Sequence, residues 1–132
     1  MSFDDKTIDQ VLAMKTWAIV GLGNNPERAA FGVSKLLQDK GHRIVPVYPI
    51  AETVHGEVGY KTLSEIPFPV DVVDCFVNSK LVGKVVDEAI EIGAKAVWLQ
   101  LDVIDSEAIA RAEAAGLLAI MDRCPAIEYR KR

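Results

Sequence analysis

The sequence has few of the residues that build metal centres, nucleophilic active sites and disulfide frameworks. Its 132 residues include two cysteines and two histidines. The spacing of metal ligands is found neither in the cysteine pair, Cys75 and Cys124, nor in the histidine pair, His42 and His55. No window holds the ~20 apolar residues of a membrane span, and the N-terminus lacks the regions of a secretory signal. We therefore expect reduced thiols, no membrane association and a cytoplasmic location.

Basic residues are outnumbered by acidic ones. Fifteen Lys and Arg residues stand against nineteen Asp and Glu residues, which gives a formal net charge of −4 at pH 7. A nucleic-acid partner would require a basic face, so we expect none. A small anionic ligand stays compatible, because backbone N–H groups and one or two cations can hold a phosphate. The length predicts one domain over residues 1–132 that is large enough to bury a core.

Apolar, β-branched runs alternate with segments of helical periodicity. The runs are nearly continuous, as is typical of parallel strands covered on both faces. They fall at residues 17–20, 43–48, 70–77, 96–101 and 117–121. The helical stripes are Val33, Leu36 and Leu37, then Val82, Val85, Val86 and Ala89, then Ala108, Ile109 and Ala112, with Ile8, Val11 and Leu12 in a short opening helix. This order predicts an α/β fold with a doubly wound, mainly parallel sheet in three layers.

Glycine follows each of the last three helical segments, at Gly41, Gly93 and Gly116. A glycine in the left-handed conformation commonly ends a helix and turns the chain into the next element. Three such joints in one short chain favour the α/β fold. The N-caps that we expect for the second and third of these helices are Ser79 and either Asp105 or Ser106.

The segment 50–69 breaks the alternation, because it is too short and irregular for a full crossover helix. Thr62-Leu-Ser-Glu65 fits a capping box, which predicts one or two helical turns. A short edge strand around residues 57–60 is a further expectation.

A Gly-x-Gly turn follows the first predicted strand. Residues 17–20 run into Gly21-Leu-Gly23, and a helical segment begins at residue 29. Such a corner can bind a phosphate, because glycine tolerates positive φ and the helix N-terminus is electropositive. A plain turn between a strand and a helix is the alternative. In a doubly wound sheet, ligands bind outside the carboxyl ends of the strands at the switch point, which brings together loops 21–28, 47–50 and 77–79.

The turn does not carry the complete dinucleotide fingerprint. Pro26 stands where Gly-x-Gly-x-x-Gly requires its third glycine, and the second strand is followed by no carboxylate until Glu52. NAD is therefore disfavoured. The apolar end of that strand suits an adenine packed against Val47 and Pro49.

Several segments carry a more specific pattern. They are residues 18–21 with Asn25-Pro-Glu-Arg28, then 43–49, 70–76, 92–100 and 121–128, of which Trp98-Leu-Gln100 and Asp122-Arg-Cys-Pro125 are the most distinctive. In these segments the chain resembles the small CoA-binding proteins with a Rossmann-like fold. It is similar to the CoA-binding domain of succinyl-CoA synthetase α subunits. The resemblance covers nearly the whole chain and implies CoA or an acyl-CoA as ligand.

The chain departs from the family pattern at three places. The family usually has Arg-Pro-Ser-Tyr where this chain has Arg28-Ala-Ala-Phe31, so a hydroxyl near the phosphates is missing. Val77 stands where the family commonly has Arg, and Asp102 stands where it usually has Gly.

The loops and the resemblance together assign ten residues to CoA binding: Gly21, Gly23, Asn24, Asn25, Arg28, Val47, Pro49, Phe76, Val77 and Ser79. Lys80 and Lys84 either meet a CoA phosphate or form a solvated helix face. The first hypothesis is non-catalytic binding of CoA or an acyl-CoA. The alternative is an NAD(P)- or other nucleotide-binding subunit of an enzyme that needs a partner chain. A degenerate Rossmann module used only for protein contacts is the third, and a partner protein or homo-oligomer stays open.

We find no catalytic group in the sequence. Cys124 is interpreted as a small residue packed in a tight turn rather than as a reactive thiol at a helix N-terminus. His42 and His55 are interpreted as structural or surface residues, His42 as a solvated residue after a helix end. The carboxylates near the strands are interpreted as solvated strand-edge groups: Asp71, Asp74 and Asp102.

Overall fold

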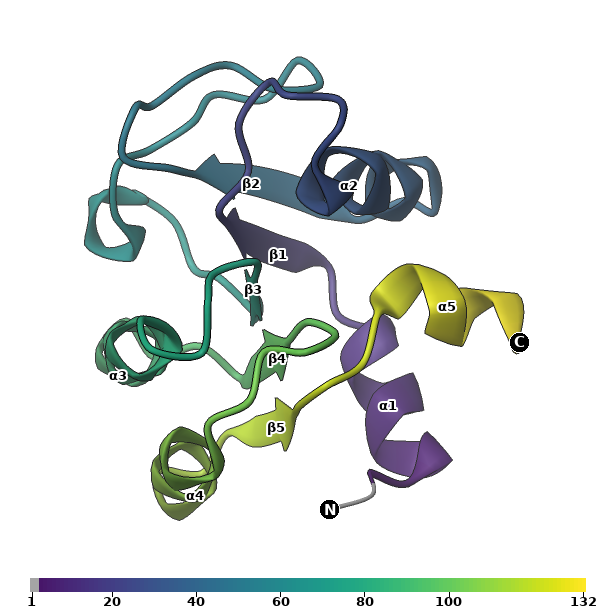
Figure 1. Cartoon of the computed structure of the whole chain (residues 1–132), viewed down its shortest axis with the longest axis vertical. Coiled ribbons are helices and arrows are strands. Elements are labelled where there is room, and N and C mark those ends of the chain that lie inside the picture. Colours follow the sequence, from purple (N-terminus) through teal and green to yellow (C-terminus); the bar gives the residue numbers. More distant parts are fainter. Residues whose placement is uncertain (1–2) are drawn as a thin grey trace.

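The computed structural model describes residues 3–132, in which helices and strands alternate along the chain (Figure 1). Five strands form one sheet of order β2-β1-β3-β4-β5, and every neighbouring pair is parallel. The strands are β1 Thr16–Val20, β2 Arg43–Val47, β3 Val72–Cys75, β4 Ala96–Leu99 and β5 Leu118–Ile120. The helices are α1 Asp5–Leu12, α2 Ala29–Asp39, α3 Val82–Glu91, α4 Ser106–Ala114, α5 Pro125–Arg130 and the 3₁₀ turn η1 Leu63–Glu65.

Two layers of helices cover the sheet. Helices α3 and α4 lie against one face, and α1, α2 and α5 lie against the other (Figure 1). Successive residues of a strand point to opposite faces. Along β1, Ala18 accordingly packs with α3 and α4, whereas Trp17 and Ile19 pack in the other layer. The predicted three-layer, doubly wound parallel sheet is confirmed. No helix within residues 3–132 is long and apolar enough to span a membrane.

The predicted helix ends are largely correct. Gly41, Gly93 and Gly116 all have positive φ, at 98°, 75° and 92°. Asp105 is the N-cap of α4, because its side chain accepts a hydrogen bond from the N–H of Ala108. These joints are local, so neighbouring residues alone were enough to predict them.

The prediction that Ser79 caps α3 is wrong. Helix α3 begins three residues later, and its first turn is preceded by Asn78, whose Oδ1 accepts the N–H groups of Lys80 and Leu81. The Ser79 hydroxyl instead accepts the N–H of Ile104 at 2.9 Å and lies 3.3 Å from the carbonyl oxygen of Asp102. Ser79 therefore ties the loop after β3 to the loop after β4.

The segment between β2 and β3 is less regular than predicted. No strand forms at residues 57–60. Two isolated bridges replace it, an antiparallel one between Val54 and Glu57 and a parallel one between Val47 and Tyr60. Only η1 forms near residue 63, and the side chain of Thr62 does not cap it. The Glu65 carboxylate of the predicted capping box accepts the N–H of Lys61 instead. The bridge at Tyr60 holds this segment against the carboxyl end of β2.

Candidate functional site

The main cleft lies at the carboxyl edge of the sheet, where the chain order reverses around β1. The strand β1 connects to β2 on one side and is paired with β3 on the other, so the ends of these three strands leave a crevice between their loops. The crevice holds a cavity of about 550 Å³, which we name the switch-point cleft. It is lined by Val20, Gly21, Arg28, Val47, Tyr48, Pro49, Lys61, Thr62, Phe76, Val77, Asn78, Leu81, Lys84, Val85 and Glu88.

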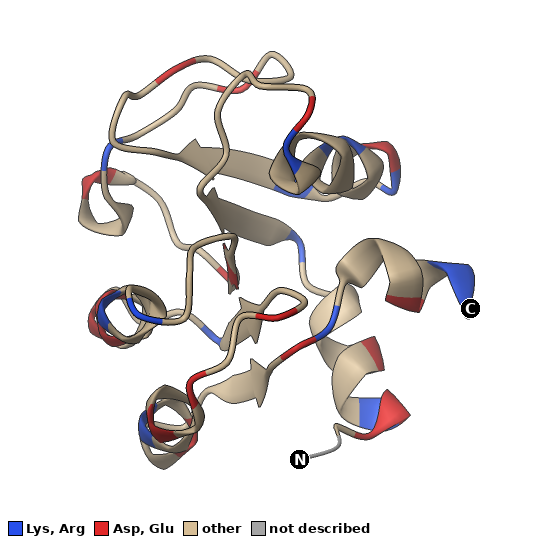
Figure 2. Ribbon diagram, in the orientation of Figure 1, with Lys and Arg blue, Asp and Glu red and all other residues tan. Residues whose placement is uncertain are grey.

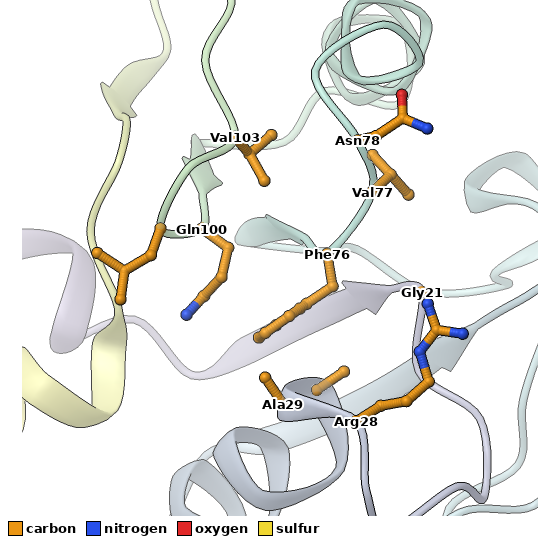
Figure 3. Close-up of a pocket in the computed structure, with 10 residues that line it drawn as sticks. Gly21, Arg28, Ala29, Phe76, Val77, Asn78, Gln100 and Val103 are labelled. Atoms are coloured by element: carbon orange, nitrogen blue, oxygen red, sulfur yellow. The ribbon is translucent and has the colours of Figure 1, made fainter.

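Two smaller cavities adjoin this cleft. One of about 300 Å³, the Gln100 pocket, lies between the start of α2 and the loop after β4 (Figure 3). Its lining is Gly21, Arg28, Ala29, Ala30, Phe76, Val77, Asn78, Gln100, Leu101 and Val103. The other, of about 330 Å³, is the Gly23 recess, lined by Gly23, Asn24, Asn25, Arg28, Tyr48 and Glu52.

The ten predicted site residues are divided among these cavities. Six of them line the switch-point cleft: Gly21, Arg28, Val47, Pro49, Phe76 and Val77. Gly23, Asn24 and Asn25 line the separate recess, which shares Arg28 and Tyr48 with the cleft. Ser79 lines none of the three cavities. The three predicted loops thus lie together, but their residues do not all line the same cavity.

Gly21 is required by close packing at the end of β1. Its φ is +101°, and a Cβ added to it would lie 2.4 Å from the carbonyl oxygen of Phe76. Its N–H donates to the carbonyl oxygen of Val47 at 2.8 Å, so this N–H is already used within the fold. Gly23 does not have positive φ, and an added Cβ would face the side chains of Glu52 and Tyr48. Of the two glycines, only Gly21 has the left-handed backbone that the turn was expected to use.

Arg28 occupies the central position of the site. It is the N-cap of α2, it lines all three cavities, and within residues 3–132 its side chain forms no ion pair or hydrogen bond. No side chain caps α2, and no acidic residue lies in its first turn. Figure 3 shows the Arg28 side chain extending from the start of α2 toward Gly21. The first N–H groups of α2 and the Arg28 guanidinium therefore form a positive corner.

Further basic side chains lie along the switch-point cleft. Lys61 and Lys84 line it, whereas Lys80 does not. Figure 2 shows basic residues at the start of α2 and on α3, around a sheet that carries few charges. Glu88 also lines the cleft, but its carboxylate accepts the N–H of Leu63 at 3.0 Å. The overall charge of the chain is negative, yet this edge presents three cations.

Sequence reasoning missed Lys61, Tyr48 and Gln100 as residues of the site. Lys61 reaches the cleft because Tyr60 pairs with the end of β2, through hydrogen bonds to Pro46 and Tyr48. No local motif signals such a long-range bridge. Gln100 was part of the distinctive Trp-Leu-Gln segment, and its position directly after β4 was the available signal.

Ring nitrogens of both histidines lie within hydrogen-bond distance of other groups in the chain. The prediction that His42 is solvated is wrong, because its side chain is buried and packs edge-on against Trp17. Its two ring nitrogens lie within hydrogen-bond distance of the Met14 carbonyl oxygen and the Tyr129 hydroxyl. Burial lowers the pKa of His42 from its ordinary value. His55 Nε2 lies 2.9 Å from the carbonyl oxygen of Phe31. Within residues 3–132 no cluster of three or more His, Cys, Asp or Glu residues could hold a metal ion.

Asp74 was predicted to be solvated at the edge of a strand, and the structure contradicts this prediction. It lies in the centre of the sheet, in register with Ile19 and Trp98, and its side chain is fully buried. Neither carboxylate oxygen has a hydrogen-bond partner among the described residues. Burial raises the pKa of Asp74 well above its ordinary value. Asp74 lines none of the three cavities, so we assign it no contact with a ligand.

The other two carboxylates are placed differently. Asp71 accepts the N–H of Thr16 at 2.9 Å and pairs with Lys95 at 3.4 Å. Asp102 is exposed and has a left-handed backbone, with φ +67°. That conformation explains why glycine suits this position in the CoA-binding proteins that the sequence resembles.

Comparison with known proteins identifies relatives over most of the chain. The sequence model of a CoA-binding domain family matches residues 15–130. YneT, an uncharacterized protein of Bacillus subtilis, is 36% identical over 110 residues, which are 83% of this chain and 82% of YneT. The α subunit of acetate–CoA ligase (ADP-forming) II from Pyrococcus furiosus is 35% identical over 81 residues. That match covers 61% of this chain and 18% of the ligase subunit.

The fold has a close counterpart among solved structures. A hypothetical protein from Pyrococcus horikoshii OT3 superposes with a TM-score of 0.93 at 37% sequence identity, over 98% of this chain and 92% of the other. The architecture and the sequence similarity therefore agree.

Proposed function

The chain belongs to the CoA-binding domain family, and from this premise we propose that it binds CoA or an acyl-CoA without catalysing a reaction by itself. The ligand lies along the carboxyl edge of the sheet, across the switch-point cleft. The observation that carries the proposal is the combination, at one point, of three features: an uncapped helix N-terminus, an Arg28 side chain with no ion pair or hydrogen bond within residues 3–132, and an adjoining cleft with apolar walls.

The start of α2 supports the phosphate contacts. Its first N–H groups lack a side-chain cap, and Arg28 adds a full positive charge beside them. A helix of this length attracts anions to its N-terminus. We place the pyrophosphate of CoA here, because Arg28 borders every cavity of the site.

The switch-point cleft suits the adenosine end of CoA. Val47 and Pro49 provide apolar surface for the adenine ring at the end of β2. Lys61 and Lys84 line the same cleft and suit the additional phosphate on the ribose of CoA, which NAD lacks. This charge pattern favours CoA over NAD.

One structural observation supports a second candidate function, the binding of a dinucleotide. Glu52 lies beside the glycine turn, within 3.3 Å of a Cβ placed on Gly23, and its carboxylate is 3.5 Å from the amide nitrogen of Asn24. A carboxylate at this place can accept the ribose hydroxyls of a dinucleotide. The chain would then be an NAD(P)- or other nucleotide-binding subunit of an enzyme with a partner chain. The name of the ligase relative, an α subunit, agrees with a subunit role.

Binding measurements separate the two candidates. We expect CoA and acetyl-CoA to raise the melting temperature, and NAD, NADP and ATP to have much smaller effects. A one-site ligand at 100 times its dissociation constant adds about 2.7 kcal/mol, which a thermal-shift experiment detects. Stabilisation by NAD without stabilisation by CoA would support the second candidate and refute the first.

The role of Arg28 is tested by calorimetry on Arg28→Ala. A charge-assisted hydrogen bond contributes roughly 1.5–3 kcal/mol, so CoA affinity should fall by about ten- to a hundredfold. The loss should shrink at high salt, because screening already weakens the wild-type interaction. Arg130→Ala, on α5, is the matched control and should bind as the wild type does. Undiminished affinity of Arg28→Ala at low salt would move the phosphates to the lysines of the cleft.

A further inference from the structure

Three buried side-chain oxygens have no hydrogen-bond partner within residues 3–132, and two residues carry all of them. They are Oδ1 and Oδ2 of Asp74 and Oε1 of Gln100. Asp74 is fully buried, and Gln100 is 7% exposed. Buried polar groups are nearly always paired, so these oxygens indicate a hydrogen-bond donor that the ordinary protonation states do not supply.

Asp74 and Gln100 are diagonal neighbours on one face of the sheet. Asp74 on β3 is in register with Trp98 on β4, and Gln100 follows Trp98 by two residues. The N–H of Gln100 donates to the carbonyl oxygen of Cys75 at 3.3 Å, so the alternation of side chains continues past the end of β4. Both side chains therefore point into the layer of α1, α2 and α5, where Trp98 also packs. A long side chain such as glutamine can reach a diagonal neighbour.

The Gln100 amide is turned so that its oxygen is enclosed. Oε1 is buried, whereas Figure 3 shows the nitrogen at the end of a side chain that extends toward the space between Phe76 and Ala29. A carboxylate and an amide oxygen only accept hydrogen bonds, so an ionised Asp74 would repel Oε1. A protonated carboxyl removes this conflict, because its O–H can donate to Oε1.

No charged partner of Asp74 is present within residues 3–132. The elements and loops that cover this face carry six titratable or charged side chains that are not exposed: His42, Asp122, Arg123, Cys124, Glu128 and Tyr129. None of them forms a hydrogen bond with the Asp74 carboxyl, and Glu128 pairs with Lys131 and Arg132 instead. The thiol of the adjacent Cys75 lies in the opposite layer. Burial raises the pKa of Asp74 well above its ordinary value, which agrees with a protonated carboxyl.

We propose that Asp74 is a positioning residue of the ligand site, whose protonated carboxyl donates a hydrogen bond to Gln100 Oε1 and so turns the Gln100 amide nitrogen toward the cavity. A glutamine side chain can present either its oxygen or its nitrogen, and the proton on Asp74 selects the nitrogen. Asp74 lines none of the three cavities, so it acts only through Gln100.

The consequence for the ligand rests on the proposed function. The Gln100 pocket shares Gly21, Arg28 and Phe76 with the switch-point cleft. A ligand held at Arg28 therefore meets a hydrogen-bond donor at this wall, and the site favours a ligand that places an acceptor oxygen there. Without the Asp74 proton the amide is free to turn, and part of this preference is lost.

The protonation of Asp74 is tested on the protein without ligand. Carbon-13 NMR at pH 6 measures the side-chain carboxyl carbon of Asp74, which is assigned by its absence from the spectrum of Asp74→Asn. We expect the chemical shift of a protonated carboxyl. Asp39, in an exposed ion pair with Lys35, is the ionised reference in the same spectrum. A shift that places Asp74 with Asp39 overturns the inference.

The positioning role is tested by a double-mutant cycle on CoA affinity, measured by calorimetry. Asp74→Val has a similar volume, suits a strand and removes the donor, whereas Asp74→Asn keeps one N–H that can donate to Oε1. We expect Asp74→Val to bind CoA about three- to tenfold more weakly, as fits the loss of one neutral hydrogen bond. Asp74→Asn should bind within about twofold of the wild type. In a Gln100→Leu background, Asp74→Val should have no further effect.

The outcomes separate this inference from the function on which it rests. Circular dichroism checks that each variant is folded, and Asp39→Val on the surface of α2 is the matched control, which should bind as the wild type does. If Asp74→Val binds CoA as the wild type does, or loses equal affinity with and without Gln100, Asp74 does not position Gln100 and the inference is wrong while the function stands. If the wild type does not bind CoA, the proposed function fails and the role of Asp74 at the ligand fails with it.

Discussion

Replacing Asp74 by asparagine should change how the stability of this protein depends on pH. Burial raises the pKa of the Asp74 carboxyl well above its ordinary value of 3.8, so the folded chain keeps it protonated to a higher pH than the unfolded chain does. The unfolded chain ionises it at the ordinary value. Above pH 3.8 the folded state therefore binds more protons than the unfolded state, and the stability contributed by this group falls as pH rises.

The size of the effect follows from linkage. One proton bound only by the folded state changes the free energy of unfolding by about 1.4 kcal/mol per pH unit. The wild type should therefore lose stability as the pH rises from 3.8 to the pH at which the folded carboxyl ionises. Asp74→Asn cannot ionise, so it should not show this loss. The constant cost of burying an unpaired amide shifts its stability equally at all pH values and does not affect the comparison.

Urea unfolding of both proteins at pH 5, 6 and 7 measures the effect. The stability of Asp74→Asn minus that of the wild type should increase with pH, at a slope of at most about 1.4 kcal/mol for each pH unit. Asp39→Asn is the control, because Asp39 lies on the surface in an exposed ion pair with Lys35. A difference that does not change with pH would refute the reasoning, since it would mean that Asp74 ionises in the folded protein as it does in the unfolded chain.

Three further predictions follow from the site and its surroundings. Gly21→Ala should lower stability by about 2 kcal/mol or more in thermal unfolding, because of its positive φ and the close Phe76 carbonyl. Gly23→Ala should cost less than about 1 kcal/mol, and equal losses would contradict the distinction between the two glycines. Burial lowers the pKa of His42 below its ordinary 6.5, so stability from this group is present above pH 6.5 and is lost as pH falls below it. Urea unfolding of His42→Asn should not show this loss of stability at low pH. If the loss persists in the variant, another group causes it. The protein alone should release no thiol from acetyl-CoA above the buffer rate, and turnover that disappears in Cys124→Ser would instead indicate a Cys-dependent enzyme.

The sequence by itself determined the class of fold and the family. Apolar runs, helical stripes and the glycines after α2, α3 and α4 depend on residues that are neighbours in the chain. These signals predicted the parallel sheet and its three layers correctly. The segments around Gly21, Gln100 and Cys124 carried the resemblance to CoA-binding proteins, which the family match over residues 15–130 confirmed.

Only the tertiary structure decided which polar groups are buried and which residues share a cavity. Asp74 and His42 look like solvated residues next to their sequence neighbours, but strands and helices that are distant in the sequence enclose them. The same holds for Lys61, which reaches the switch-point cleft through a bridge to β2. Burial and cavity lining depend on contacts between distant segments, so no local pattern of residues encodes them.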